Sequence, residues 1–194
     1  MALSPGPDNI YVLVQGVSKG VKYGLATVYG LISGCVVHTT LVAFGAAAII
    51  RQNENLFLAL KIFGSLYLLF LAYKTYKTYK SNTVIHLNHA GANNKNTLQL
   101  FKQGFLMNVL NPKVSLFFLA FFPGFLFSEN LSPLVQFFIL GGIFMATSLI
   151  VFSGIAILSG SIAGYINKHP KANSYLKWLQ IIIFIGIAGY ILFV

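Results

Sequence analysis

The amino-acid sequence predicts an all-α, polytopic membrane bundle of about six spans, arranged as two inverted three-helix repeats. Three observations lead to this prediction. The chain of 194 residues is 57% hydrophobic and only 8% charged, whereas soluble domains carry roughly a quarter charged residues. Apolar stretches recur at lengths that cross a hydrocarbon core of about 30 Å. The cations gather in alternate connections between these stretches.

The apolar stretches define the expected spans. Six segments are expected to be spans, and the first and shortest of them, Ser4–Val17, has 14 residues and would measure about 21 Å as a helix. Because that is shorter than the hydrocarbon core, either the segment is re-entrant or the functional protein has further residues upstream of it, and we favour the second interpretation. Five longer stretches qualify by themselves: Gly24–Ile50, Leu56–Tyr73, Gln103–Phe127, Leu134–Gly160 and Tyr175–Val194.

The charges predict the orientation of the chain. The connections after the second and fourth segments hold Arg51 with Glu54, and Glu129. The other connections hold ten lysines: Lys19, Lys22, Lys74, Lys77, Lys80, Lys95, Lys102, Lys168, Lys171 and Lys177. Membrane proteins keep such basic connections in the cytoplasm, which predicts six crossings with both termini outside. The net charge of +10 therefore indicates a lipid bilayer, and not nucleic acid, as the partner.

The predicted organisation is a single membrane domain, residues 1–194, with repeat one at 1–73 and repeat two at 103–194. A polar cytoplasmic loop, 74–102, is expected between them, because the segment lacks apolar periodicity and contains Asn, Gly and His. Three spans in each half place the second half in the opposite orientation. Transporters commonly use inverted repeats of this kind and bind substrate near the midplane, where helices are interrupted.

Each half begins with a proline-containing motif, "SPGPDN" in the first and "NVLNPK" in the second. Proline interrupts a helix because it lacks a backbone donor, and it suits the first position of a new helix after a Ser or Asn cap. Ser4-Pro5 and Asn111-Pro112 match that pattern. Each is expected to turn the positive end of a half-helix, which attracts carboxylates, toward the interior.

Two ionisable residues follow these breaks, Asp8 and Lys113. An ionisable side chain inside a membrane costs at least about 2.5 kcal/mol and so indicates function. Asp8 is a candidate to bind an ammonium group or to carry a proton, and Lys113 to bind a carboxylate or to neutralise Asp8. Together they suit a zwitterion. A purely structural ion pair between them is the alternative.

Other polar residues allow fewer conclusions. His38, within the second span, titrates near neutral pH; a proton relay with Asp8 and a neutral histidine bonded to nearby backbone are both open. Cys35 is the single cysteine, which excludes a disulfide or a dithiol redox pair within one chain. His86 and His89 have no carboxylate or thiolate neighbours, so no metal or cofactor is predicted. Gly30-x-x-x-Gly34 predicts close helix packing. No enzyme motif is present.

These motifs resemble the LysE/RhtB family of amino-acid exporters. The matching segments are "LSPGPDNIYVL", "GLATVYGLISGCVVH", "KIFGSLYLLFLAYK" and "FKQGFLMNVLNPKVSLFFLAFFPGF", so the resemblance covers nearly the whole chain. The sequence departs from the family at Ala72, where glycine is common, and in the few apolar residues before Pro5.

The resemblance implies a multi-pass protein of the bacterial inner membrane that exports amino acids or their analogues, driven by the proton gradient. Its partners would be a small zwitterionic amino acid and protons, and a homo-oligomer is left open. A passive channel or facilitator of the same fold is the alternative. Asp8 and His38 are the proton-coupling candidates. The substrate-binding positions implied by the motifs are Pro5, Gly6, Pro7, Asp8, Asn9, Asn108, Asn111, Pro112 and Lys113.

Overall fold

A computed structural model describes residues 2, 6–52, 54–80, 95–168 and 170–193. The described residues form helices and no strand, which confirms the all-α prediction. Pro5, His86 and His89 lie outside the described residues. The elements in chain order are α1 (Pro7–Lys19), α2 (Val21–Gln52), α3 (Glu54–Lys80), α4 (Thr97–Val109), α5 (Pro112–Phe121), the 3₁₀ turn η1 (Phe122–Phe125), α6 (Pro133–Ile157), α7 (Ser159–Lys168) and α8 (Pro170–Phe193).

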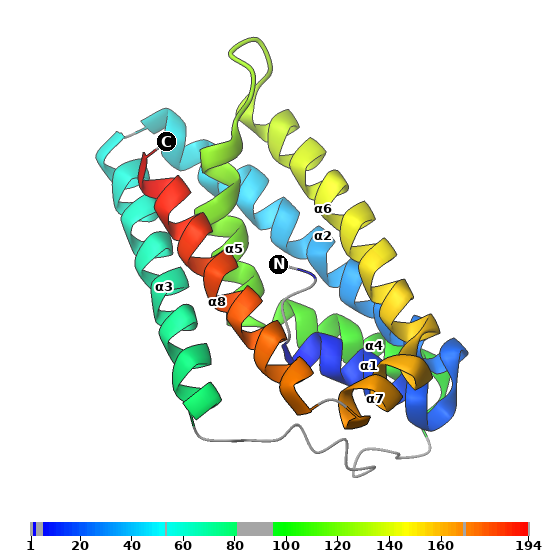
Figure 1. The fold of residues 1–194 in the computed structure, drawn as a ribbon. Coiled ribbons are helices and arrows are strands. Elements are labelled where there is room, and N and C mark those ends of the chain that lie inside the picture. The colour runs from blue at the N-terminus through cyan, green and yellow to red at the C-terminus, as the bar shows by residue number, and fades with distance from the viewer. Residues whose placement is uncertain (1, 3–5, 53, 81–94, 169, 194) are drawn as a thin grey trace.

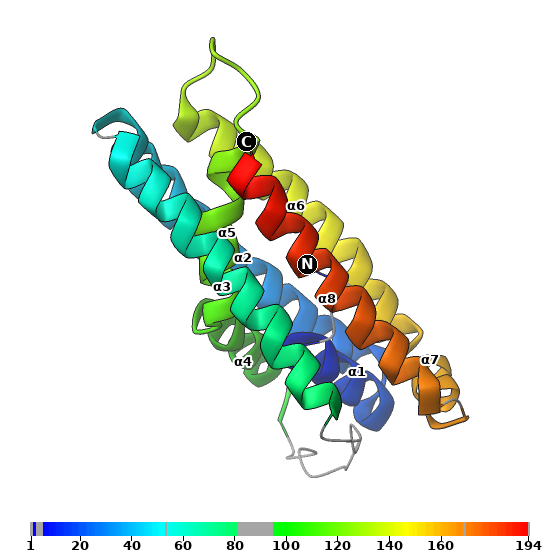
Figure 2. The ribbon, with the colours of Figure 1, turned by 60° about the vertical axis from the view of Figure 1, so that its left-hand side comes forward.

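Long helices run side by side through the molecule, and shorter ones gather toward one end (Figures 1 and 2). Helix α2 packs along α4 and α6, and α3 packs along α8. Helix α1 lies against α2, α6 and α7. The shorter helices α1, α4 and α7 occupy the lower part of Figure 1, while α5 rises from the end of α4 toward the opposite end.

The predicted basic connections lie at one end of the bundle. The α1–α2 joint, the ends of α3 and α7 and the start of α8 are at the bottom of Figure 1, and the end of α2, the start of α3 and the connection before α6 are at the top. Gly20 forms the α1–α2 joint with φ of 99°, a conformation that residues with a Cβ rarely adopt.

Three boundaries differ from the sequence prediction. Helix α3 continues to Lys80 and α4 begins at Thr97, so the polar connection is shorter at both ends than expected. Helix α6 ends at Ile157 and is followed by α7, which the sequence analysis did not predict. Lysine is a good helix former, so basic residues extend helices beyond the apolar stretches. Nine of the ten lysines expected in connections lie in helices: Lys19, Lys22, Lys74, Lys77, Lys80, Lys102, Lys168, Lys171 and Lys177.

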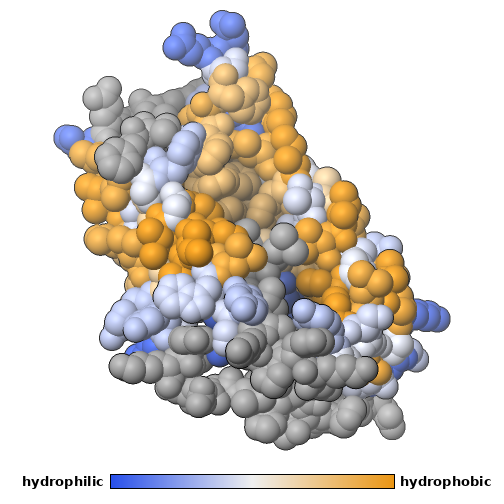
Figure 3. Space-filling model, viewed as in Figure 1, coloured by the Kyte–Doolittle hydropathy of each residue, from blue (hydrophilic) through white to orange (hydrophobic). Residues whose placement is uncertain are grey.

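The outer surface is apolar, as a membrane bundle requires. Figure 3 shows hydrophobic residues covering much of the visible face, with hydrophilic residues at the top of the view. Ile143 and Ile150 of α6 and Ile182 of α8 are each 60% exposed or more. Soluble monomers rarely expose contiguous apolar surface on this scale. Two described stretches, Val21–Gly45 and Pro133–Ile157, are long and apolar enough to cross a membrane.

Glycines bring α2 and α4 into backbone contact. A Cβ added at Gly30 would overlap the backbone carbonyl of Phe101, and one added at Gly104 would overlap the carbonyl of Thr27. The predicted role of Gly30 and Gly34 in close packing is therefore confirmed. The contact seats α4 firmly on α2, immediately before the break that leads into α5.

Candidate functional site

The break between α4 and α5 is built by Asn111 and Pro112. Helix α4 ends at Val109, and Asn111 adopts an extended conformation (φ −81°, ψ 105°) before Pro112 begins α5. The Asn111 side-chain oxygen accepts a hydrogen bond from the Lys113 backbone N–H at 3.1 Å. This is the predicted cap-then-proline arrangement, and it satisfies a backbone donor that the start of a helix leaves without a partner. Pro112 itself is exposed and serves the backbone.

His38 completes the break from the neighbouring helix α2. In a continuous helix the carbonyl of Asn108 would accept from the N–H of residue 112, which proline lacks. Instead the Asn108 carbonyl accepts from the Asn111 N–H at 3.0 Å and lies 3.0 Å from His38 Nε2. Because a carbonyl only accepts, Nε2 carries the proton. His38 is 3% exposed and packs on the Phe118 ring.

The first break starts α1 two residues later than predicted. Gly6 is the N-cap, in an extended conformation, and Pro7 is the first helical residue; Ser4 and Pro5 lie outside the described residues. Pro7-Asp8, and not Ser4-Pro5, is therefore the counterpart of Pro112-Lys113. No side chain in the described part of the chain caps this helix start. The Asn9 side chain instead donates to the Ala2 carbonyl at 2.7 Å.

The two breaks meet through Asp8 and Asn111, which are 103 positions apart in the sequence. Asn111 Nδ2 donates to Asp8 Oδ2 at 3.2 Å. Asp8 is only 7% exposed, and its second oxygen, Oδ1, has no hydrogen-bond partner among the described residues. Lys113 is close enough to attract the Asp8 carboxylate electrostatically, and its Nζ lies 5.1 Å from the centre of the Phe184 ring.

A cavity lies where the breaks meet. It brings together seven of the predicted site residues: Gly6, Pro7, Asp8, Asn9, Asn108, Asn111 and Lys113. The structure does not place Pro112 or His38 in its wall, although both shape the break behind it. The cavity has a volume of about 30 Å³, which is room for about two water molecules.

Comparison with known proteins assigns the chain to a family. The family described as LysE type translocator matches residues 1–193. The chain belongs to the LysE type translocator family. It is therefore a membrane transport protein and not an enzyme. No solved structure matches the chain.

Curated relatives of this translocator are efflux proteins. The chain is 29% identical to the homoserine/homoserine lactone efflux protein of Salmonella typhimurium over 91% of its own length and 83% of the relative. It is 30% identical to the protein of the same name in Salmonella typhi, with the same coverage. It is 29% identical to the leucine efflux protein of Klebsiella pneumoniae, over 96% of its own length and 87% of the relative.

Five residues of the translocator's cavity were missed by sequence reasoning: Ala2, Cys35, Val114, Phe144 and Phe152. Cys35 was considered only for redox chemistry, yet it lies beside Asn108 in the cavity wall. Phe144 and Phe152 are two turns apart on α6, a spacing that puts both on one face. Helix α6 is apolar on all sides, so its sequence does not indicate which face points inward.

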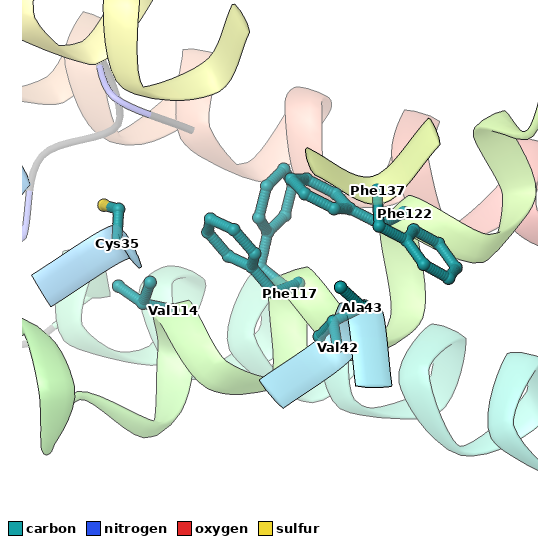
Figure 4. Close-up of a cluster of buried hydrophobic side chains, with 8 residues drawn as sticks. Cys35, Val42, Ala43, Val114, Phe117, Phe122 and Phe137 are labelled. Atoms are coloured by element: carbon teal, nitrogen blue, oxygen red, sulfur yellow. The ribbon is translucent and has the colours of Figure 1, made fainter. Parts of the chain in front are cut away.

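Two apolar clusters border the translocator's cavity. The Phe118 cluster comprises Cys35, Val42, Ala43, Val114, Phe117, Phe118, Phe122 and Phe137, and Figure 4 shows Cys35 and Val114 at one end of it. The Val12 cluster comprises Val12, Val28, Leu31, Phe152 and Ala156, nearer the basic end. Phe144 packs on the first cluster and Phe152 belongs to the second, so the cavity lies between them.

Proposed function

We propose that this chain exports an amino acid or a close derivative across the bacterial inner membrane in exchange for protons. The observation that carries the proposal is Asp8, a buried acid in the cavity where the two helix breaks meet. One of its oxygens is held by Asn111 and the other has no hydrogen-bond partner within the described residues. A buried carboxylate in a transporter is suited to bind either a cation or a proton.

The names of the relatives support the substrate class. Homoserine and leucine are α-amino acids, and homoserine lactone retains the α-amine of homoserine but has no free carboxylate. The group common to all three compounds is a primary amine. A carboxylate such as that of Asp8 is the side chain that pairs with this group when the amine is protonated.

Competition between substrate and proton at Asp8 would couple export to the proton gradient. Ionised Asp8 attracts the substrate ammonium strongly inside the bundle, where the effective dielectric constant is low. One proton arriving on the carboxylate removes its charge and releases the ammonium. The titratable side chains that share the cavity with Asp8 are Lys113 of α5 and Cys35 of α2, and His38 contacts it indirectly, through the Asn108 carbonyl.

Substrate passage would require the two apolar clusters to open in turn. The cavity of about 30 Å³ is smaller than an amino acid needs, so binding must widen it. Phe152 in the Val12 cluster is suited to close the basic side, and Phe144 against the Phe118 cluster to close the other. Opening only one side at a time is the alternating access that transporters with inverted repeats use.

The placement of charge supports a multi-pass orientation with the basic end in the cytoplasm. The ends of α1 and α3 and the start of α8 lie together at one end of the bundle, and they carry Lys19, Lys80 and Lys171. The opposite end carries the acidic Glu129 in the connection before α6. This distribution follows the positive-inside rule.

Flux measurements in proteoliposomes test the proposal. A pH gradient imposed across the liposomes should drive uphill movement of homoserine or leucine by the full chain. Asp8→Asn should lose at least about 100-fold of that flux, because the amide neither ionises nor takes up a proton. Glu129→Gln, at an exposed acid outside the cavity, is the matched control and should retain it. Downhill flux that no pH gradient can drive uphill would show a passive facilitator instead.

A further inference from the structure

Two buried oxygen atoms at the cavity have no hydrogen-bond partner in the described part of the chain. They are Oδ1 of Asp8 and Oδ1 of Asn108. Asp8 is 7% exposed and Asn108 is 3% exposed, and both residues line the cavity. A buried acceptor without a donor is costly, by about 1–3 kcal/mol and more for a charged group. Two such acceptors at one cavity indicate a ligand that donates hydrogen bonds.

The structure holds Asn108 in place for this role. Its backbone carbonyl is bonded by His38 and by the Asn111 N–H. Its side chain lies directly over Gly34 of α2, where an added Cβ would come within 2.6 Å of Oδ1. Any larger residue at position 34 would displace the amide. Gly34 therefore has a second consequence besides helix packing, because it leaves room for the Asn108 side chain at the cavity.

The donors on the α5 side of the cavity are already engaged. The Lys113 backbone N–H is capped by Asn111 Oδ1, and Asn111 Nδ2 donates to Asp8. Pro112 has no N–H. The Lys113 ammonium lies over the Phe184 ring, an arrangement that itself stabilises a cation. A substrate carboxylate would have to displace these contacts, whereas an ammonium group meets two acceptors that have none.

We infer that Asp8 and Asn108 form a binding site for a primary ammonium group, and that this group, and not the carboxylate, is what the cavity selects. The inference rests on the proposed export function and specifies its substrate class. An –NH₃⁺ group has three donors and a positive charge, which match one carboxylate oxygen and one amide oxygen. Amines whose carboxylate is esterified or amidated are then substrates, and N-acylated amino acids are not.

Ligand binding to the full chain in detergent tests the inference without relying on proton coupling. Shifts in the thermal unfolding temperature at increasing ligand concentration yield an apparent Kd. Two series serve as probes: homoserine, homoserine lactone and N-acetylhomoserine, and leucine, leucinamide and N-acetylleucine. In at least one series the amine-only compound should bind within about tenfold of the parent, and the N-acetyl compound at least about tenfold more weakly than the amine-only compound.

Substitutions at Asn108 locate the site. Asn108→Leu removes the acceptor while keeping the number and branching of the side-chain heavy atoms, and it should weaken binding of the amine-bearing probes about tenfold. Asn108→Asp keeps an acceptor and should retain binding, and it also serves if the leucine variant fails to fold. Asn130→Leu, in the exposed connection before α6, is the matched control and should leave binding unchanged.

Three results would overturn the inference. The first is equal binding of the N-acetyl compound and its parent in both series. The second is failure of every amine-only compound to bind. The third is stabilisation by sodium chloride but not by choline chloride, which would show an inorganic cation at these oxygens. If the amines bind as expected but no pH gradient drives flux, the proton-exchange proposal fails and the ammonium site stands. If flux is proton-driven but N-acetyl compounds bind equally well, only the ammonium site fails.

Discussion

The starts of α1 and α5 use the same backbone design with opposite chemistry. Each has an extended cap residue, proline at the first helical position and an ionisable residue at the second: Pro7-Asp8 in α1 and Pro112-Lys113 in α5. The α5 start is capped by the Asn111 side chain, whereas Gly6 supplies no side chain to cap α1. The start of α1 is therefore acidic and lacks a side-chain cap, whereas the start of α5 is basic and capped.

The two helix starts therefore have different roles: the start of α5 is mainly structural, and the start of α1 supplies the carboxylate. The second break satisfies its own backbone through Asn111 and His38, and Asn111 also reaches across to hold Asp8. The first break contributes the Asp8 carboxylate, which lines the cavity and whose second oxygen is buried without a hydrogen-bond partner among the described residues. The two breaks therefore contribute unequally: Asn111 of the second break positions the Asp8 carboxylate of the first.

The largest effect is expected from disrupting the contact between α2 and α4, which holds α4 in place immediately before the second break. Gly30→Leu places a side chain where the Phe101 backbone carbonyl lies, and backbone cannot yield as a flexible side chain does. We expect a loss of about 3 kcal/mol or more in stability, measured as a lower unfolding temperature and a poor yield of folded protein in detergent. Gly142→Leu on α6 is the control, since no described atom beyond its own stretch of helix lies within 4 Å of its added Cβ. Equal stability of the two variants would show that the α2–α4 contact does not position the break.

The next effect concerns Asn111, which serves both starts. Asn111→Ala removes the cap of α5 and the hydrogen bond to Asp8, and should lower stability by about 2–3 kcal/mol. Asn111→Ser keeps a capping oxygen but is too short to reach Asp8, so it should recover about 1 kcal/mol. Thermal unfolding in detergent measures both. If serine recovers nothing, the cap is not what Asn111 contributes, and the contrast between the two helix starts loses its basis.

The breaks could be predicted from the sequence because proline and its neighbours act locally. Asn111-Pro112 carries its own cap, and the pattern alone located the start of α5. The start of α1 was placed at Pro5 because two prolines, Pro5 and Pro7, offer the same signal and only the backbone conformation distinguishes them. The prediction that Asp8 and Lys113 act together rested on the expected opposed topology of the two halves and on the cost of leaving either side chain in lipid, and both residues do line one cavity.

The remaining cavity wall could not be predicted, because it depends on how each helix is rotated about its axis. Phe144 and Phe152 belong to a helix that is apolar on every face, and nothing in their spacing distinguishes lipid-facing from inward-facing residues. Cys35 was recognisable only as the neighbour of Gly34. Helix α7 (Ser159–Lys168) was not predicted. Its first residues were assigned to the end of the preceding apolar span, and the rest to a polar connection before the last span.

A smaller effect is expected at His38, where substitutions can distinguish a structural role, as the donor to the Asn108 carbonyl, from a role in proton transfer. His38→Leu leaves the Asn108 carbonyl without its side-chain donor and should cost about 1–2 kcal/mol. His38→Gln retains an N–H donor but does not titrate in the physiological range. We expect the glutamine variant to keep proton-driven flux in liposomes, since His38 does not line the cavity. A glutamine variant that is stable yet uncoupled would make His38 a proton carrier and would shift part of the chemistry to the second break.

The smallest effect is expected from giving α1 the cap that α5 already has. Gly6 is extended (φ −155°, ψ 177°), a conformation open to any residue, so Gly6→Ser introduces a capping hydroxyl without backbone strain. Replacing a glycine cap by serine gains a few tenths of a kcal/mol, or about 1 °C in unfolding temperature. Export should nevertheless fall, because Gly6 lines the cavity. The serine hydroxyl would bond to the α1 backbone at the edge of the cavity and compete there with a bound substrate. Gly6→Ala adds similar bulk without the hydroxyl and should slow export with no gain in stability. If serine and alanine are indistinguishable in stability, a cap is not what α1 lacks, and the open first break must be explained by the space it leaves at Asp8.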